Sequence, residues 1–153
     1  MQISDLLATD RIANDMPAAS KKRLLEQISA LLASGQTSLT QSEIFESLIS
    51  RERLGSTGFG HGVAIPHGRA AGADHTVAAF VRLGESIDFD AIDGQPVDLL
   101  FALLVPEEST DEHLELLSHL ARMFSDPALL EQLRAAAAPE AIYKLLSEWQ
   151  PPD

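Results

Sequence analysis

A histidine placed between a proline and a glycine is the residue of this chain best presented for chemistry. His67 follows segment 55–65, in which closely spaced glycines run into a short apolar stretch. Pro66 fixes its own backbone, and Gly68 leaves room for another molecule to come close. Because an unprotonated imidazole nitrogen is a competent nucleophile at neutral pH, His67 is a candidate acceptor for a phosphoryl group.

The charge around His67 differs in sign from that of the whole chain. The 153 residues include 11 basic and 23 acidic side chains, for a formal net charge of −12. Such a field repels nucleic acid and anionic lipid, so we expect no nucleic-acid partner. Between positions 51 and 73, three arginines and one glutamate give a local charge of +2: Arg51, Glu52, Arg53 and Arg69. The three arginines could attract a small anion, or they could be an ordinary fluctuation of composition.

His113 is the second candidate. It lies in the first turn of a helix predicted over about 109–125, within about 40° of Leu117 around the helix axis, so we expect it to face inward. A buried histidine usually has a structural role and donates to a backbone carbonyl. The alternative is that this helix begins opposite the His67 strand, and two imidazoles beside arginine would then form a phosphoryl site. His119 falls on the charged face of the same helix and is expected at the surface.

Nucleotide and metal sites have no signature in the chain. The glycine-rich segment is not followed by Gly-Lys-Ser/Thr, and its spacing is not that of a dinucleotide-binding fingerprint. His61, His67 and His75 have no recognised ligand spacing, and there is no cysteine. We therefore expect no cofactor and no metal. A binding module in which His67 and His113 only pack, or hold a metal, remains as an alternative of another class.

The elements that must position these side chains can be predicted from periodicity and capping patterns. Ser20 and the capping box Thr40–Glu43 begin two amphipathic helices, the first ending near Gly35 and the second running into Arg51 and Arg53. A second capping box, Ser109–Glu112, begins the helix of His113. Three strands and two further helices complete the prediction: strands 63–65, 77–83 and 97–105, the last ended by Pro106, and helices beginning at Asp126-Pro127 and at Pro139.

These elements predict one α/β (or α+β) layered domain, in which a small mixed parallel and antiparallel sheet is flanked by helices on both faces. The length suits a single domain, and no repeat or flexible linker divides the chain. Strand 97–105 is nearly all apolar, as expected for a central strand covered on both faces. The longest apolar run, Leu99–Val105, has seven residues, too few for membrane insertion. The first ten residues lack the basic charge of a signal peptide, so we expect a cytoplasmic protein.

Several of these segments together resemble the fructose/mannitol-type enzyme IIA (EIIA type-2) domains of bacterial phosphotransferase systems, and among them the nitrogen-regulatory members. The likeness runs over nearly the whole chain, with a core of about 3–149, so residues 1–153 are expected to form a single EIIA type-2 domain. The segments that carry the resemblance are 55–69 with its Ala-Ile-Pro-His-Gly block, Phe89–Asp93, Pro96–Pro106, and His113-Leu114 through Leu117-Ser118.

The resemblance implies a role for each matching position. The phosphorylated histidine of the family falls on His67, its second active-site histidine on His113, and its active-site arginine on Arg51. The phosphoryl group of the family is carried on imidazole Nε2, although the sequence does not show which nitrogen. His61 stands where relatives often carry asparagine. The residues expected to line the phosphate-binding loop are Ser56, Thr57, Gly58, Gly60, Gly62 and Gly68.

The resemblance also implies partners. In the family, the phosphoryl group comes from phosphoenolpyruvate through an enzyme I and a small HPr-like histidine carrier. The nitrogen-regulatory members act as phosphorylation-dependent regulators, with targets such as potassium-transport regulators and sensor kinases. Because the chain contains no IIB or IIC sequence, we favour this regulatory phosphotransferase component over a sugar-transport EIIA that passes phosphate to a IIB domain.

Overall fold

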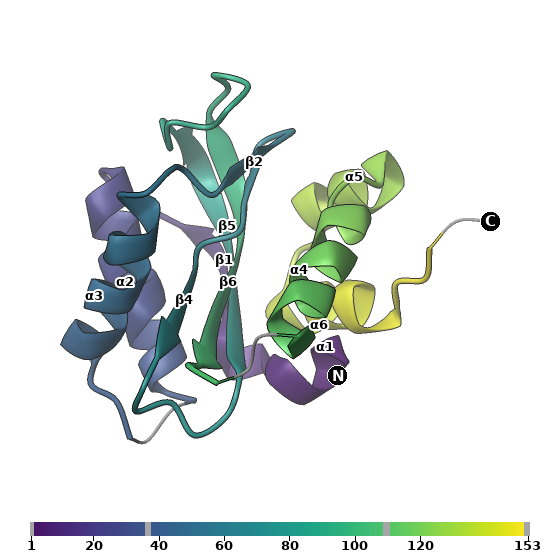
Figure 1. Ribbon diagram of the computed structural model, residues 1–153. Helices are drawn as coiled ribbons and strands as arrows, with labels where there is room; N and C mark the ends of the chain where they lie inside the picture. The colour runs from purple at the N-terminus through teal and green to yellow at the C-terminus, as the bar shows by residue number, and fades with distance from the viewer. Residues whose placement is uncertain (1, 36–37, 109–110, 152–153) are drawn as a thin grey trace.

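The computed structural model describes all residues except 1, 36–37, 109–110 and 152–153. A six-stranded sheet lies between two layers of helices (Figure 1). The α/β architecture predicted from the sequence is confirmed. In chain order the elements are α1 Ile3–Leu6, η1 Thr9–Arg11, β1 Ile12–Met16, α2 Lys21–Ala33, α3 Gln41–Glu52, β2 Gly58–Gly60, β3 Val63–Ala64, β4 His67–Ala70, β5 Val77–Ile87, β6 Val97–Pro106, α4 Asp111–Met123, α5 Pro127–Ala135 and α6 Pro139–Glu148.

Strand β6 is the centre of the sheet. The strand order is β1-β5-β6-β3-β2, and β4 also pairs with β6. Strand β5 runs antiparallel to β6, whereas β3 and β4 run parallel to it. The prediction of a mixed sheet with a central apolar strand is therefore confirmed.

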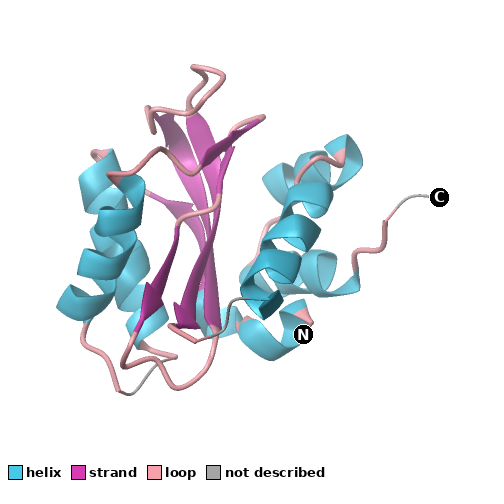
Figure 2. Ribbon diagram, viewed as in Figure 1, coloured by secondary structure: helices cyan, strands magenta, loops and turns pink. Residues whose placement is uncertain are grey.

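Each face of the sheet has its own hydrophobic core. Helices α2 and α3 cover one face with side chains such as Leu24, Leu25, Ile28 and Leu48. Helices α1, α4, α5 and α6 cover the other, where Leu120 is among the buried residues. The two layers are seen edge-on in Figure 2.

The helix starts follow the predicted chemistry. The Ser20 hydroxyl accepts from the backbone N–H of Arg23, and Thr40 and Glu43 form the reciprocal capping box. The Asp126 side chain caps α5 by accepting from the N–H of Ala128. Of the capping box predicted at Ser109–Glu112, Ser109 and Thr110 lie outside the described residues. Elements α1, η1, β1, β2 and β4 are not predicted from the sequence, and β5 extends four residues beyond its predicted end, to Ile87 rather than Leu83.

Segment 63–70 is the part of the sheet that positions His67. It pairs with β6 as two short strands, β3 and β4, and the register is the same on both sides of Pro66: Val63 is opposite Leu99, and His67 is opposite Leu103. Proline has no N–H to donate, but the Pro66 carbonyl still accepts from the backbone of Leu103. Alternate residues of a strand face the same side, so His67 shares the α4 face with Val63.

Gly68 points the other way, toward α3. A Cβ at Gly68 would collide with the Ser47 side chain and come within 3.1 Å of the Ser47 carbonyl. The Ser47 hydroxyl also donates to the carbonyl of Arg69 at 2.9 Å. The space beside Gly68 is therefore filled by α3, and its missing side chain permits close contact between helix and strand, not the approach of another molecule.

This contact predicts a large cost for a methyl group at Gly68. We expect Gly68→Ala to lower the free energy of unfolding by about 1–3 kcal/mol, because the fixed backbone of Ser47 cannot move away. The measurement is urea denaturation. Gly72→Ala is the matched control, since its Cβ would meet the mobile end of the Leu39 side chain; equal stability of the two variants would contradict the prediction.

Candidate functional site

The orientation of the His67 ring is set by a backbone carbonyl. Its Nδ1 lies 2.7 Å from the carbonyl oxygen of Ile65. A carbonyl can only accept a hydrogen bond, so Nδ1 must carry the hydrogen and donate it. In the neutral ring, the unprotonated nitrogen is then Nε2. The half-buried imidazole of His67 is therefore held with a nucleophilic lone pair on the nitrogen opposite its anchor.

His113 faces His67 from the first turn of α4. The ring centroids are 5.4 Å apart with an interplanar angle of 53°. His113 is only 5% exposed, so the predicted inward orientation is confirmed, as is the juxtaposition of the two imidazoles. Its Nδ1 is buried and has no hydrogen-bond partner among the residues that the structure describes. This nitrogen therefore does not donate to a backbone carbonyl of those residues, which is the usual structural role of a buried histidine.

Burial and neighbouring cations favour the neutral form of both rings. Burial, followed by the charges of His67 and Arg69, lowers the pKa of His113 to about 4. Burial is also the main reason why the pKa of His67 is lowered; its hydrogen bond to Ile65 and the carboxylate of Glu52 oppose the shift, whereas Arg51 and Arg69 add to it. Both imidazoles are therefore neutral at pH 7, as a nucleophile must be.

Arg51 lies at the end of α3 and holds the start of the glycine-rich loop. Its Nη1 donates to the carbonyl of Gly55 at 2.8 Å. The next residues of the loop are bound to the protein: the Ser56 hydroxyl donates to the Phe89 carbonyl and accepts from the N–H of Gly58. The carbonyl of Thr57 accepts from the N–H of Ile65 at 3.0 Å. This part of the loop thus lies against the strand that leads to His67.

Gly60 and Gly62 belong to a different part of the molecule. They flank the turn of the β2–β3 hairpin, where Arg134 pairs with Asp98 at 2.9 Å and donates to the carbonyl of His61. The Gly62 carbonyl accepts from the N–H of Leu99. His67 pairs with Leu103, four residues beyond Leu99 along β6. At the rise of a strand, this separates His67 from the hairpin by about 13 Å. These two glycines shape a hairpin and do not line the His67 site.

Two further charged residues, whose positions are not predicted from the sequence, lie at the site. Arg69 is exposed, is two residues from His67 on the same strand face, and lowers the pKa of both imidazoles. Glu52 is buried and accepts hydrogen bonds from the N–H and hydroxyl of Thr57. No periodic signal in the sequence marks Arg69, because β4 has no apolar alternation. Nothing local marks Glu52 as buried.

The other histidines lie apart from this pair. His119 is half-buried, with its ring edge-on to Trp149 at 5.4 Å, so the prediction of a plain surface residue is wrong. Burial, followed by the charge of Arg122, lowers the pKa of His119. His61 has a φ of 59°, a left-handed conformation that asparagine tolerates better than most residues.

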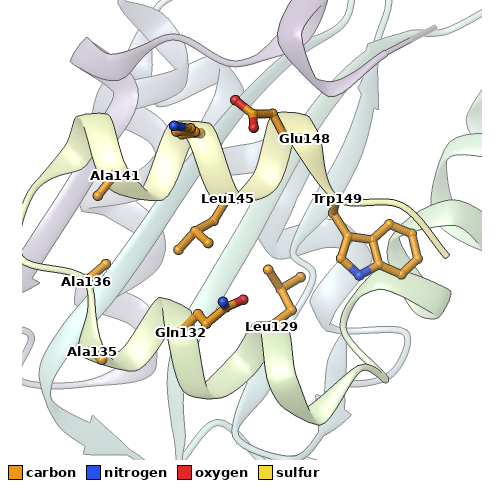
Figure 3. Close-up of a pocket in the computed structure, with 9 residues that line it drawn as sticks. Leu129, Gln132, Ala135, Ala136, Ala141, Leu145, Glu148 and Trp149 are labelled. Atoms are coloured by element: carbon orange, nitrogen blue, oxygen red, sulfur yellow. The ribbon is translucent and has the colours of Figure 1, made fainter. Parts of the chain in front are cut away.

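An apolar groove of about 520 Å³ lies between α5 and α6. Figure 3 shows Leu129 and Leu145 in the space between these two helices, with Trp149 at one end. The groove contains neither His67 nor His113, so it is distinct from the imidazole pair.

Within the described ranges, no group of three or more acidic, histidine or cysteine side chains is placed to hold a metal, and no helix is long and apolar enough to span a bilayer.

Comparison with known proteins places the chain in a family. Residues 5–149 match the family described as "Phosphoenolpyruvate-dependent sugar phosphotransferase system, EIIA 2". A nitrogen regulatory protein from Pseudomonas aeruginosa is 45% identical over 150 residues, covering 98% of this chain and 97% of that protein. The crystal structure of nitrogen regulatory protein IIA-Ntr from Neisseria meningitidis has a TM-score of 0.91 and 48% identity over 94% of this chain and 98% of its own. An enzyme IIA for mannitol from Escherichia coli, solved in complex with phosphorylated enzyme IIB, covers 94% of this chain and 98% of its own, with a TM-score of 0.78; at 18% identity it shows the fold alone.

The buried neutral ring of His113 predicts how stability depends on pH. In the unfolded chain His113 binds a proton near its ordinary pKa of 6.5, whereas in the folded protein it does so only near 4. Its contribution is therefore fully present above pH 6.5 and is lost as the pH falls toward 4, by up to about 3 kcal/mol. Urea denaturation between pH 7 and pH 4.5 should show a steeper loss in the wild type than in His113→Gln. Parallel pH dependences of the two proteins would contradict the assignment.

Proposed function

The chain belongs to the EIIA type-2 family of the phosphoenolpyruvate-dependent sugar phosphotransferase system, and from this membership we propose that His67 is the residue that accepts the phosphoryl group and passes it on. The observation that carries this proposal is the hydrogen bond from Nδ1 to the Ile65 carbonyl. It fixes the tautomer and leaves the Nε2 lone pair free to attack phosphorus.

The transfer step needs no group beyond the two proteins. The lone pair of His67 Nε2 forms a new bond to phosphorus while the bond between phosphorus and the donor's nitrogen breaks, and that electron pair stays on the donor. Negative charge on the transferring oxygens is stabilised by nearby cations and donors. Arg51 and Arg69 supply the positive charge, and His113 supplies a second imidazole at 5.4 Å between ring centroids.

We propose an HPr-like histidine carrier as the donor and regulatory proteins as the readers of the phosphorylated state, such as potassium-transport regulators or sensor kinases. The nitrogen-regulatory relatives at 45% and 44% identity support this choice over sugar transport. The second candidate is transfer to a IIB domain, suggested by the enzyme IIA for mannitol that was solved with phosphorylated IIB. Incubation of the phosphorylated protein with a IIB domain separates the two: loss of label to IIB would favour the transport role.

Labelling tests the assignment of His67 directly. After incubation with enzyme I, an HPr-like carrier and phosphoenolpyruvate, intact mass should show one acid-labile phosphoryl group on the wild type. His67→Ala should carry none, because the nucleophile is gone, whereas His119→Ala should be labelled like the wild type. A label that survives the loss of His67 would overturn the assignment.

Arg51→Ala should slow labelling while the fold persists. The variant loses a positive charge near His67 and the hydrogen bond to Gly55, and loss of one such contact reduces transfer by roughly 100- to 1,000-fold. The rate of phosphate uptake from the carrier is the measurement. Arg53→Ala, at an exposed position two residues further on, is the matched control. Equal rates for the two variants would show that Arg51 has no role in the transfer.

An exposed apolar side chain beside His113 predicts where the carrier docks. Leu114 is 62% exposed and follows His113 directly, so a carrier that delivers phosphate to His67 would cover it. We expect Leu114→Asp to raise the carrier concentration needed for half-maximal labelling by about tenfold, since it places a charge in the interface. Ile92→Asp is the matched control, because Ile92 is 90% exposed in the β5–β6 loop, at the opposite end of β6 from α4. An equal effect of the two substitutions would place the docking surface elsewhere.

A further inference from the structure

The carboxylate of Glu52 is buried beside the loop that leads to His67. Its side chain is only 2% exposed, and one oxygen lies 2.7 Å from Nζ of Lys21. The other oxygen accepts from the N–H of Thr57 at 2.9 Å and from the Thr57 hydroxyl. A carboxylate is costly to bury unless it is paired and hydrogen-bonded. The ion pair with Lys21 and the two Thr57 donors offset this cost.

Lys21 occupies the first position of α2, where the positive end of the helix dipole disfavours a cation. Three groups hold it there. In addition to Glu52, the carboxylate of Asp90 lies 3.5 Å from Nζ, and the ring centroid of Phe89 lies 4.6 Å away. Because Asp90 is largely exposed, its attraction is weakened by solvent. The buried pair with Glu52 is therefore the principal contact of Lys21.

A chain of hydrogen bonds joins this ion pair to the nucleophile. Glu52 accepts from the N–H of Thr57 at 2.9 Å, and the Thr57 carbonyl accepts from the N–H of Ile65 at 3.0 Å. The Ile65 carbonyl accepts from Nδ1 of His67 at 2.7 Å. The position of the His67 ring thus depends, through two backbone segments, on where Glu52 holds Thr57.

Resting on the function proposed above, we infer that the Glu52–Lys21 ion pair is a positioning and charge-setting element for His67. The pair fixes the loop that orients the imidazole, and its carboxylate repels the negatively charged phosphoryl group when that group is bonded to Nε2. It therefore favours release of the phosphoryl group to the next protein. In that step the bond from Nε2 to phosphorus breaks, its electron pair returns to Nε2, and phosphorus bonds to the acceptor's nucleophilic atom.

The charges that face His67 come from three elements. Arg51 and Glu52 lie on α3, Arg69 lies on β4, and His113 lies on α4. The two arginines lower the pKa of His67, whereas Glu52 raises it. A phosphoryl group on Nε2 carries the opposite charge from a proton, so the carboxylate that favours protonation disfavours phosphorylation. Glu52 thus counterbalances the two arginines and keeps the phosphoryl group transferable.

Four variants separate charge from position. Glu52→Gln removes the negative charge but keeps an acceptor for Thr57, and Lys21→Met leaves the carboxylate with the Thr57 donors alone. Thr57→Val removes the hydroxyl contact and keeps both charges. Lys22→Met, at an exposed neighbouring position, is the matched control. Two equilibrium quantities are measured: the pKa of the His67 ring by NMR on unphosphorylated protein, and the ratio of phosphorylated to free protein at equilibrium with the HPr-like carrier. The rate of labelling by the carrier is measured as well.

We expect the two charge variants to act in opposite directions. Glu52→Gln should lower the pKa of His67 by about 0.5, a threefold loss of proton affinity, and raise the phosphorylated-to-free ratio at least threefold. Lys21→Met should raise the pKa and lower the ratio. Thr57→Val should slow labelling without moving either equilibrium, and Lys22→Met should change nothing.

The outcomes also distinguish this inference from the proposed function. If wild-type His67 is not phosphorylated, the proposed function fails, and the NMR titration of the unphosphorylated variants still tests the charge-setting role. The inference is overturned if the wild type is phosphorylated but the Glu52 and Lys21 variants match it. It is also overturned if, within a variant, the pKa of His67 and the phosphorylated-to-free ratio shift in the same direction. Lys21→Met also provides the test if Glu52→Gln fails to fold.

Discussion

The structure of the site depends on the register of segment 63–70 against the buried strand β6. His67 lies opposite Leu103 and faces α4, while Gly68 lies opposite Leu104 and faces α3. A slip of one residue would exchange the two faces. It would press an imidazole into the contact with Ser47 and leave a glycine opposite His113. Because the same register holds on both sides of Pro66, the irregular strand still delivers His67 to one defined place.

Strand alternation also explains why the site draws on both helical layers. Helix α3 packs against β4 on one face, and its last turn brings Arg51 and Glu52 toward the loop. Helix α4 begins on the other face and brings His113. Since β4 lies beside β6 but off the main strand path, helix ends from either side can reach the residue between them. The site therefore forms at the edge of the sheet, outside the two hydrophobic cores, where charged side chains can be accommodated.

The sequence predicts the parts of the structure that periodic or capping patterns encode. The inward position of His113 follows from the 3.6-residue period, and the burial of β6 follows from its apolar run. Strand β4 was missed because His-Gly-Arg-Ala has no apolar alternation. The expectation that Gly60 and Gly62 line the phosphate-binding loop comes from the family resemblance and from their nearness to His67 in sequence, but the hairpin directs Gly62 toward Arg134 and Gly60 toward Asp93. The burial of Glu52 depends on Lys21, which comes from another helix, so local sequence carries no sign of it.

The balance of charge explains why two neutral imidazoles suit the site better than two cations. Burial and Arg69 disfavour protonation of both His67 and His113, and Arg51 adds to this effect at His67. On the proposed function, a phosphoryl group on His67 would bring negative charge next to both rings and oppose this preference, because a nearby anion stabilises the protonated form. The second ring can then gain a proton and a hydrogen bond when charge is present, and lose both when it leaves. A permanently charged residue at His113 would bind the phosphoryl group in every state, which would oppose its transfer onward.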